Sequence, residues 1–145
     1  MCIRDSKWTV RVYHEDTDGG GIVYYANYLK FMERARTEYL RSLGFEQDTL
    51  LQTDKCLFVV THVSIDYVQP AVFNDELTVT CEPESIGKAR FKLRQVVVRE
   101  VPGGATDQEL TRADVTLACL DSDSLAVRRI PPAVKIALDA SLLTD

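Results

Sequence analysis

The 145-residue sequence has no long hydrophobic segment and no excess of positive charge. A membrane-spanning helix needs about 20 consecutive apolar residues, and the longest apolar runs, such as residues 57–60, are far shorter. The first seven residues also lack the apolar stretch of a signal peptide. Seventeen basic residues against 22 acidic ones give a net charge of -5, which does not build the positive field used in non-specific nucleic-acid binding. We therefore expect a cytoplasmic protein with no nucleic-acid partner.

Histidines and closely spaced cysteines are scarce as well. The chain has two histidines and no H-E-x-x-H motif, so a zinc hydrolase is poorly supported. The four cysteines are too far apart in the sequence for a C-x-x-C redox or zinc motif; they are Cys2, Cys56, Cys81 and Cys119. We predict reduced, mostly buried thiols and no metal ion, with a structural disulfide or a metal site as the alternative.

The composition is that of an ordinary globular protein, with 46% hydrophobic and 27% charged residues and few glycines and prolines. At this length a single domain buries roughly two thirds of the surface that the unfolded chain exposes. The sequence has neither internal repeats nor low-complexity tracts. We predict one domain spanning residues 1–145.

Hydrophobic periodicity predicts one strand, one long helix and then four more strands. Residues 8–12 alternate between apolar and polar side chains, as a half-buried strand does. Apolar residues then recur every three or four positions from Tyr28 to Leu43, which indicates one face of a helix, and Gly44 supplies a C-terminal stop. Period two returns in four further segments, at residues 59–68, 77–81, 89–98 and 110–121.

Turn residues separate these segments, and they lie at Pro70, Gly87 and residues 102–104. In the second predicted strand, Val59 and Val63 are expected to share one face, while His62, Ser64 and Asp66 share the other. The segment after Pro131 and Pro132 is predicted to be helical. This order indicates an α+β fold in which a five-stranded antiparallel sheet wraps one buried helix. Its uncovered edges predict a homo-oligomer.

Carboxylates and glycines meet at the junction between the first strand and the helix. Asp16 and Asp18 precede three successive glycines, of which Gly20 and Gly21 allow the backbone to turn sharply and approach a ligand closely. The helix that follows begins with unpaired N–H groups at the positive end of its dipole. A carboxylate facing a polarised carbonyl suffices for acyl transfer, as a nucleophile or as a general base. An ordinary turn is the alternative.

Other catalytic patterns are weaker. The glycines are not followed by the Lys-Ser or Lys-Thr pair of a phosphate-binding loop. His62, Ser64 and Asp66 lie roughly 6.5 to 7 Å apart along a strand, too far for a catalytic triad. His14, beside the acidic pair, is a candidate supporting group or an ordinary solvated or core histidine.

Four basic residues share one face of the fourth predicted strand; they are Lys88, Arg90, Lys92 and Arg94. They indicate either a phosphate-binding site or an ordinary charged surface.

The stretch YHEDTDGGGIVYYANYLKFMERARTEYLRSLGF, residues 13–45, closely resembles the signature of the 4-hydroxybenzoyl-CoA thioesterase family. The similarity is greatest to the branch of acyl-CoA thioesterases associated with the bacterial Tol-Pal system. It extends over almost the whole chain, including FVVTHVSIDYVQPA at residues 58–71 and the turn at Gly87. The first six residues match nothing in the family, so we expect them to lie outside the core.

The resemblance implies a hotdog fold in which two subunits form one continuous sheet, dimers often pair into tetramers, and active sites lie at subunit boundaries. It also implies that Asp18 is the catalytic carboxylate and that the Tyr25 backbone N–H polarises the thioester carbonyl. Many members of the Tol-Pal branch carry His where this chain has Tyr25. Gly20 and Gly21 would give the substrate room, and Arg90 and Lys92 would bind its phosphates.

The resemblance thus indicates hydrolysis of a fatty or aromatic acyl-CoA, with coenzyme A as part of the substrate and no retained cofactor. A hydratase of this fold would need a histidine where Val23 stands, so that activity ranks lower. A non-catalytic module that binds acyl thioesters or acyl-carrier protein is the alternative function. By analogy with the family, phospholipid-synthesis enzymes are candidate partners, and association with the inner membrane is a candidate location.

Overall fold

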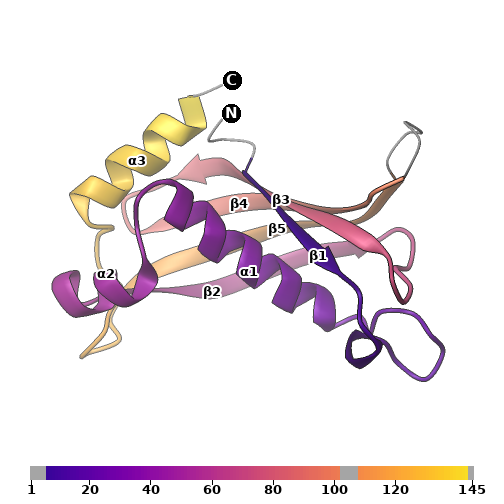
Figure 1. Ribbon diagram of the computed structural model, residues 1–145. Helices are drawn as coiled ribbons and strands as arrows, with labels where there is room; N and C mark the ends of the chain where they lie inside the picture. The colour runs from indigo at the N-terminus through magenta and orange to yellow at the C-terminus, as the bar shows by residue number, and fades with distance from the viewer. Residues whose placement is uncertain (1–5, 102–107, 144–145) are drawn as a thin grey trace.

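One antiparallel sheet of five strands dominates the computed structural model, which describes residues 6–101 and 108–143 (Figure 1). The strand order is β1-β3-β4-β5-β2, so β1 and β2 are the two edges. β3 and β4 are antiparallel neighbours joined by a short turn at Gly87, whose N–H donates to the Arg90 carbonyl at 2.7 Å, whereas the chain crosses from the edge strand β2 to β3. The strands are β1 (Ser6–Arg11), β2 (Cys56–Tyr67), β3 (Glu76–Ile86), β4 (Arg90–Arg99) and β5 (Gln108–Asp121).

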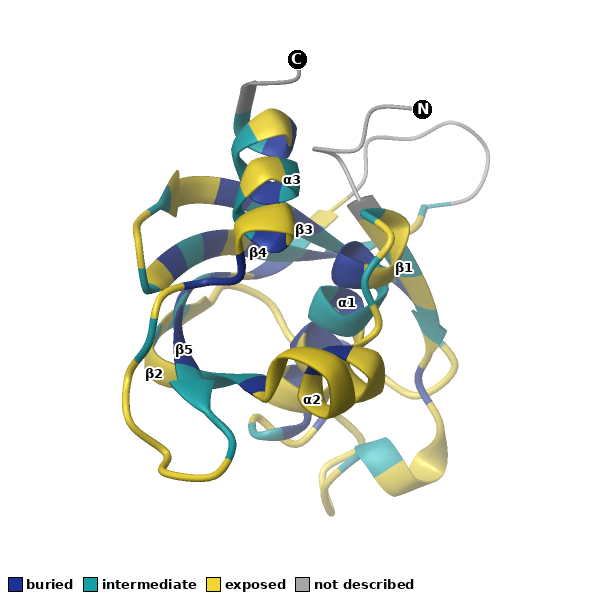
Figure 2. Ribbon diagram, turned by 90° about the vertical axis from the view of Figure 1, so that its left-hand side faces the viewer, coloured by how far each residue is buried: buried dark blue, intermediate teal, exposed yellow. Residues whose placement is uncertain are grey.

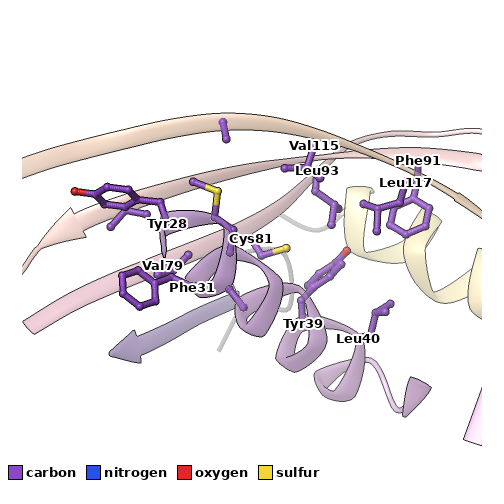
Figure 3. Close-up of a cluster of buried hydrophobic side chains, with 14 of the residues drawn as sticks. Tyr28, Phe31, Tyr39, Leu40, Val79, Cys81, Phe91, Leu93, Val115 and Leu117 are labelled. Carbon is purple, nitrogen blue, oxygen red and sulfur yellow. The ribbon is translucent and has the colours of Figure 1, made fainter. Parts of the chain in front are cut away.

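The long helix α1 (Asn27–Ser42) lies across one face of this sheet, and the strands curve around it (Figure 2). Its apolar side chains fall on one face because they recur every three or four residues. Phe31 and Tyr39 point from this face toward Val79 and Cys81 of β3 (Figure 3). Gly44 ends the segment with φ +97°, a conformation that favours glycine. The predicted five-stranded α+β hotdog fold is confirmed.

Two shorter helices lie on the same side of the sheet as α1 (Figure 2). The segment α3 (Pro132–Leu143) is the predicted terminal helix, and the Tyr39 hydroxyl lies 2.6 Å from Ser141 Oγ. The segment α2 (Gln47–Asp54) was not predicted. Leu50 is its only buried residue, so its apolar pattern is too weak to indicate a helix.

The alternation predicted for the second strand is wrong around Thr61. A β-bulge between Val60 and His62 adds one residue to β2 relative to β5. Such an insertion reverses which side chains face the core. Phe58 therefore packs against Phe91 at 5.3 Å before the bulge, whereas the half-buried Val63 follows it. Val59 and Val63 do not share a face.

The cysteines of the described chain are free and buried in strands, as predicted; they are Cys56, Cys81 and Cys119. The Sγ atoms of Cys56 and Cys119 lie 3.1 Å apart between β2 and β5. Burial raises the pKa of the Cys56 thiol to about 12 and also raises that of Cys81, so both remain protonated at neutral pH. Cys2 and the predicted break at residues 102–104 lie outside the described residues.

Candidate active site

The two aspartates of the D-x-D motif have different surroundings. Asp16 closes a 3-10 turn, η2 (His14–Asp16), and its Oδ2 accepts a hydrogen bond from the Tyr13 N–H at 2.9 Å. Its Oδ1 accepts one from Asn27 Nδ2, also at 2.9 Å, at the first residue of α1. Both oxygens of Asp16 therefore hold the turn against the start of the helix.

Asp18 instead begins the glycine turn and exposes its side chain. Its N–H donates to the Ile22 carbonyl at 2.9 Å, and its own carbonyl accepts from the Gly21 N–H at 3.3 Å. Oδ1 accepts a hydrogen bond from the Gly20 N–H at 2.7 Å, while Oδ2 has no hydrogen-bond partner among the residues that the structure describes. This second oxygen is available to a ligand.

Both predicted glycine positions are constrained by the turn. Gly21 has φ +84°, which a side chain disfavours. A Cβ on Gly20 would lie 3.3 Å from Asp18 Oδ1, closer than most such contacts, so it would press on the carboxylate. Gly19 has neither constraint.

Short stretches of pairing hold the turn against its neighbours. Thr17 pairs with Val23, and Ile22 pairs with Val72 in the loop between β2 and β3. The Tyr24 N–H donates to the Asp16 carbonyl at 2.9 Å. Asp18 therefore lies in a loop that is attached to the loop between β2 and β3.

The predicted oxyanion donor lies two residues before α1. The Tyr25 carbonyl accepts a hydrogen bond from the Tyr67 hydroxyl at 3.0 Å. The Tyr25 N–H has no hydrogen-bond acceptor in the described part of the chain, and the residue is 62% exposed. Since it lies at the positive end of a 16-residue helix, this N–H is well placed to hold a carbonyl oxygen that gains charge.

An open hollow of about 310 Å³ adjoins this segment. Three tyrosines form much of its wall, and Tyr67 packs edge-on against both Tyr25 and Tyr28. The Tyr28 hydroxyl accepts from the Ala71 N–H at 3.0 Å, and burial raises its pKa. The remaining lining is mostly apolar: Ile22, Val23, Val68, Gln69 and Pro70.

Within one chain, Arg90 and Lys92 lie far from Asp18. The C-terminal end of β4 is the end that reaches the Asp18 region. There, Arg99 forms an ion pair at 2.9 Å with Asp75 of the loop between β2 and β3. Arg90 and Lys92 precede Arg99 by nine and seven residues, which is about 30 and 23 Å at about 3.3 Å per residue. They alternate with the buried Phe91, so they face away from α1. A single chain does not bring these predicted residues together.

The remaining candidates occupy other environments. His62, Ser64 and Asp66 are exposed along β2, as expected for a strand surface. His14 is exposed and stacks on Phe73.

Within residues 6–101 and 108–143, no group of three His, Cys, Asp or Glu side chains is arranged to hold a metal ion. None of the helices in this part of the chain is long and apolar enough to cross a membrane.

Sequence reasoning missed two residues of this region. Tyr67 contacts the Tyr25 carbonyl from the end of β2, 42 residues away, and no local pattern indicates that contact. Asn27, the first residue of α1, donates to Asp16, and its position directly before a helical apolar run was the available signal.

Comparison with known proteins agrees with this geometry. The sequence profile of the thioesterase superfamily matches residues 20–106. The chain is 43% identical to the acyl-CoA thioesterase YbgC of Haemophilus influenzae over 128 residues, covering 88% of this chain and 90% of that protein. A probable thioesterase from Bartonella henselae has a TM-score of 0.78 at 33% identity, covering 88% of this chain and 99% of that one.

A second solved structure is similar over nearly the same length. A mutant of 4-hydroxybenzoyl-CoA thioesterase in complex with 4-hydroxybenzoyl-CoA has a TM-score of 0.84 at 25% identity, covering 93% of this chain and 98% of that one. The family resemblance seen in residues 13–45 is therefore confirmed. With its hotdog fold and its match over most of the chain, the protein belongs to the thioesterase superfamily.

Proposed function

We propose that this protein hydrolyses acyl-CoA thioesters and that Asp18 is its catalytic carboxylate. The observation that carries the proposal is Oδ2 of Asp18, which has no hydrogen-bond partner within residues 6–101 and 108–143 and lies in a glycine turn held beside the start of α1. The relatives named acyl-CoA thioesterase support the substrate class. Coenzyme A is then part of the substrate and leaves as a product.

Two routes use the same groups. In the first, Asp18 Oδ2 attacks the thioester carbonyl carbon, the C–S bond breaks, and coenzyme A leaves as the thiolate. Water then hydrolyses the mixed anhydride, releasing the acid and regenerating Asp18. In the second, Asp18 removes a proton from a water molecule that attacks the same carbon; the C–S bond then breaks, the acid is released, and coenzyme A leaves as the thiol after taking up the proton from Asp18. In both, the Tyr25 N–H stabilises the oxyanion.

The tyrosine-lined hollow is the proposed place for the acyl group. Its wall is mostly apolar, as sites for small organic ligands usually are. Gly20 and Gly21 leave the backbone side of the turn free of side chains. The hollow is open to solvent in the isolated chain, so acyl-chain length depends on what covers it.

A second copy of the chain completes the proposed site. Arg90 and Lys92 are too far from Asp18 in one chain, so their role in binding the phosphates of coenzyme A requires them to come from another subunit. The edge strand β2, with its exposed Val60 and Tyr67, is the proposed contact. Light scattering after gel filtration tests for a dimer or tetramer. An unchanged Michaelis constant in Arg90→Ala/Lys92→Ala would refute the phosphate role.

Release of free coenzyme A thiol from short, long and aromatic acyl-CoAs tests the activity. Asp18→Asn is the sharpest variant, because its amide oxygen still accepts from the Gly20 N–H and the turn is retained. We expect turnover to fall at least about 100-fold with the fold intact. Binding without turnover by either protein would instead support a module that binds acyl thioesters or acyl-carrier protein. A cytoplasmic or membrane-peripheral location and phospholipid-synthesis partners stay predictions.

A further inference from the structure

His14 and Phe73 form a parallel stack on the surface beside the proposed catalytic turn. Their ring centroids are 3.8 Å apart and their planes differ by 5°. His14 begins η2, four residues before Asp18, whereas Phe73 lies in the loop between β2 and β3. Both side chains are exposed, so neither is needed to fill the core.

The stack joins the segment around His14 to the loop that carries Phe73. The residues before and after Phe73 in that loop also contact the segment of residues 12–22. On one side, the Asn74 N–H donates to the Val12 carbonyl at 2.9 Å. On the other, Val72 pairs with Ile22, whose carbonyl accepts the Asp18 N–H. Phe73 therefore lies between the end of the β1–β3 ladder and the segment that contains the Asp18 turn.

The backbone of His14 reaches the same turn directly. Its carbonyl accepts hydrogen bonds from Thr17 Oγ1 at 2.7 Å and from the Thr17 N–H at 3.1 Å. These contacts form a continuous ring. His14 is bonded to Thr17, the neighbour of Asp18, and the Asp18 N–H is bonded to Ile22. Ile22 pairs with Val72, and the next residue, Phe73, stacks on the His14 ring.

These contacts are important for the position of the Asp18 turn because η2 has no buried residue. Packing in the core therefore does not hold the turn that precedes Asp18. It is held by backbone hydrogen bonds, such as that from the Tyr24 N–H to the Asp16 carbonyl, and by side-chain contacts, which are the carboxylate bonds of Asp16 and the ring stack. Segments with few buried contacts open locally at low free-energy cost, and small displacements of a catalytic group are expensive in rate.

We propose that His14 and Phe73 are positioning residues that hold the Asp18 turn in its productive arrangement. The proposal rests on the catalytic role proposed for Asp18. Neither ring lines the tyrosine hollow, so the stack acts on the turn rather than on the substrate. An aromatic contact of this kind corresponds to about a 3- to 10-fold change in rate.

Steady-state hydrolysis of one acyl-CoA by His14→Ala, Phe73→Ala, the double variant and His14→Phe tests the proposal. We expect each single alanine variant to lower kcat about 3- to 10-fold with KM within about twofold, and the double variant to be no slower than the slower single variant. His14→Phe restores a stacking ring and should recover the native kcat. Ile136→Ala, which removes another exposed apolar side chain (69% exposed) on α3, is the matched control and should match the native protein.

Asp18→Asn in the same assay separates the two hypotheses. If it retains native turnover, the proposed function fails. If it loses turnover while His14→Ala keeps the native kcat, only the positioning role fails. The positioning role is also overturned if His14→Phe is as slow as His14→Ala, if the two alanine effects multiply, or if the loss in kcat is matched by a loss in Tm that Ile136→Ala does not show.

Discussion

The side chain of Asn27 donates a hydrogen bond to Asp16 Oδ1 at 2.9 Å and thereby ties the 3-10 turn to the first residue of α1. The other oxygen of Asp16 is also occupied, by the Tyr13 N–H. Asp18, two residues later, keeps one oxygen unpartnered among the described residues. The two aspartates of the motif thus differ: Asp16 supports the structure, and Asp18 is the carboxylate that we propose faces the substrate.

Asp16→Ala and Asn27→Ala should each lower the free energy of unfolding by about 1 to 2 kcal/mol, because each removes a partner of a partly buried hydrogen bond. The double variant should be little worse than either single one. Urea unfolding followed by circular dichroism measures this, with Asp18→Asn as the control that keeps native stability. Native stability in Asp16→Ala would show that its two hydrogen bonds do not hold the turn.

Alanine at each of the three glycines should distinguish a steric effect on Asp18 from backbone strain. Gly21→Ala is expected to cost about 1 kcal/mol of stability because of its positive φ. Gly20→Ala should lower kcat with little effect on stability, since its Cβ presses on Asp18 Oδ1. Gly19→Ala is the control for both. Equal kcat in the Gly19 and Gly20 variants would contradict the contact with Asp18.

The proposed donor at position 25 is a backbone group, so the side chain there should matter little. Tyr25→Phe should keep turnover within about threefold, whereas replacing the Tyr25 amide N–H by an ester oxygen should lower kcat about 100- to 1,000-fold. Thiol release from acyl-CoA measures both. A native rate in the ester variant would place the oxyanion elsewhere.

High pH should destabilise the fold through buried groups that resist ionisation. Burial raises the pKa of Tyr39 to about 12, from an ordinary value near 10. Because the folded protein holds this proton more tightly than the unfolded chain, the stabilisation is fully present below about pH 10 and is lost as the pH rises toward 12. The shift corresponds to about 3 kcal/mol, and the thiols of Cys56 and Cys81 act in the same direction.

Tyr39→Phe isolates the tyrosine contribution. It should be less stable at neutral pH, since the buried Ser141 loses its partner, but it should lose less stability between pH 9 and pH 11.5. Urea midpoints across that range measure the difference. Parallel curves for the two proteins would show that Tyr39 does not contribute to alkaline unfolding.

Local sequence signals predicted the elements whose patterns repeat within the element. The spacing of Phe31, Ala35 and Tyr39 indicates the helix, and alternation over most of their length indicates β3, β4 and β5, because burial of one face selects for that period. The predictions failed where a single residue changes the register, as at the Thr61 bulge, and where few residues are buried, as in α2.

The sequence alone predicted the family, the fold class and the carboxylate that we propose for catalysis, because a D-x-D motif, three glycines and an amphipathic helix are properties of neighbouring residues. The tertiary structure alone decided which aspartate is used structurally, that Tyr67 and Phe73 join the site region, and that Arg90 and Lys92 lie at the opposite end of their strand. Each of these depends on how separate segments are placed in space, and such contacts, as between Tyr67 and the Tyr25 carbonyl 42 residues away, leave no local pattern in the sequence.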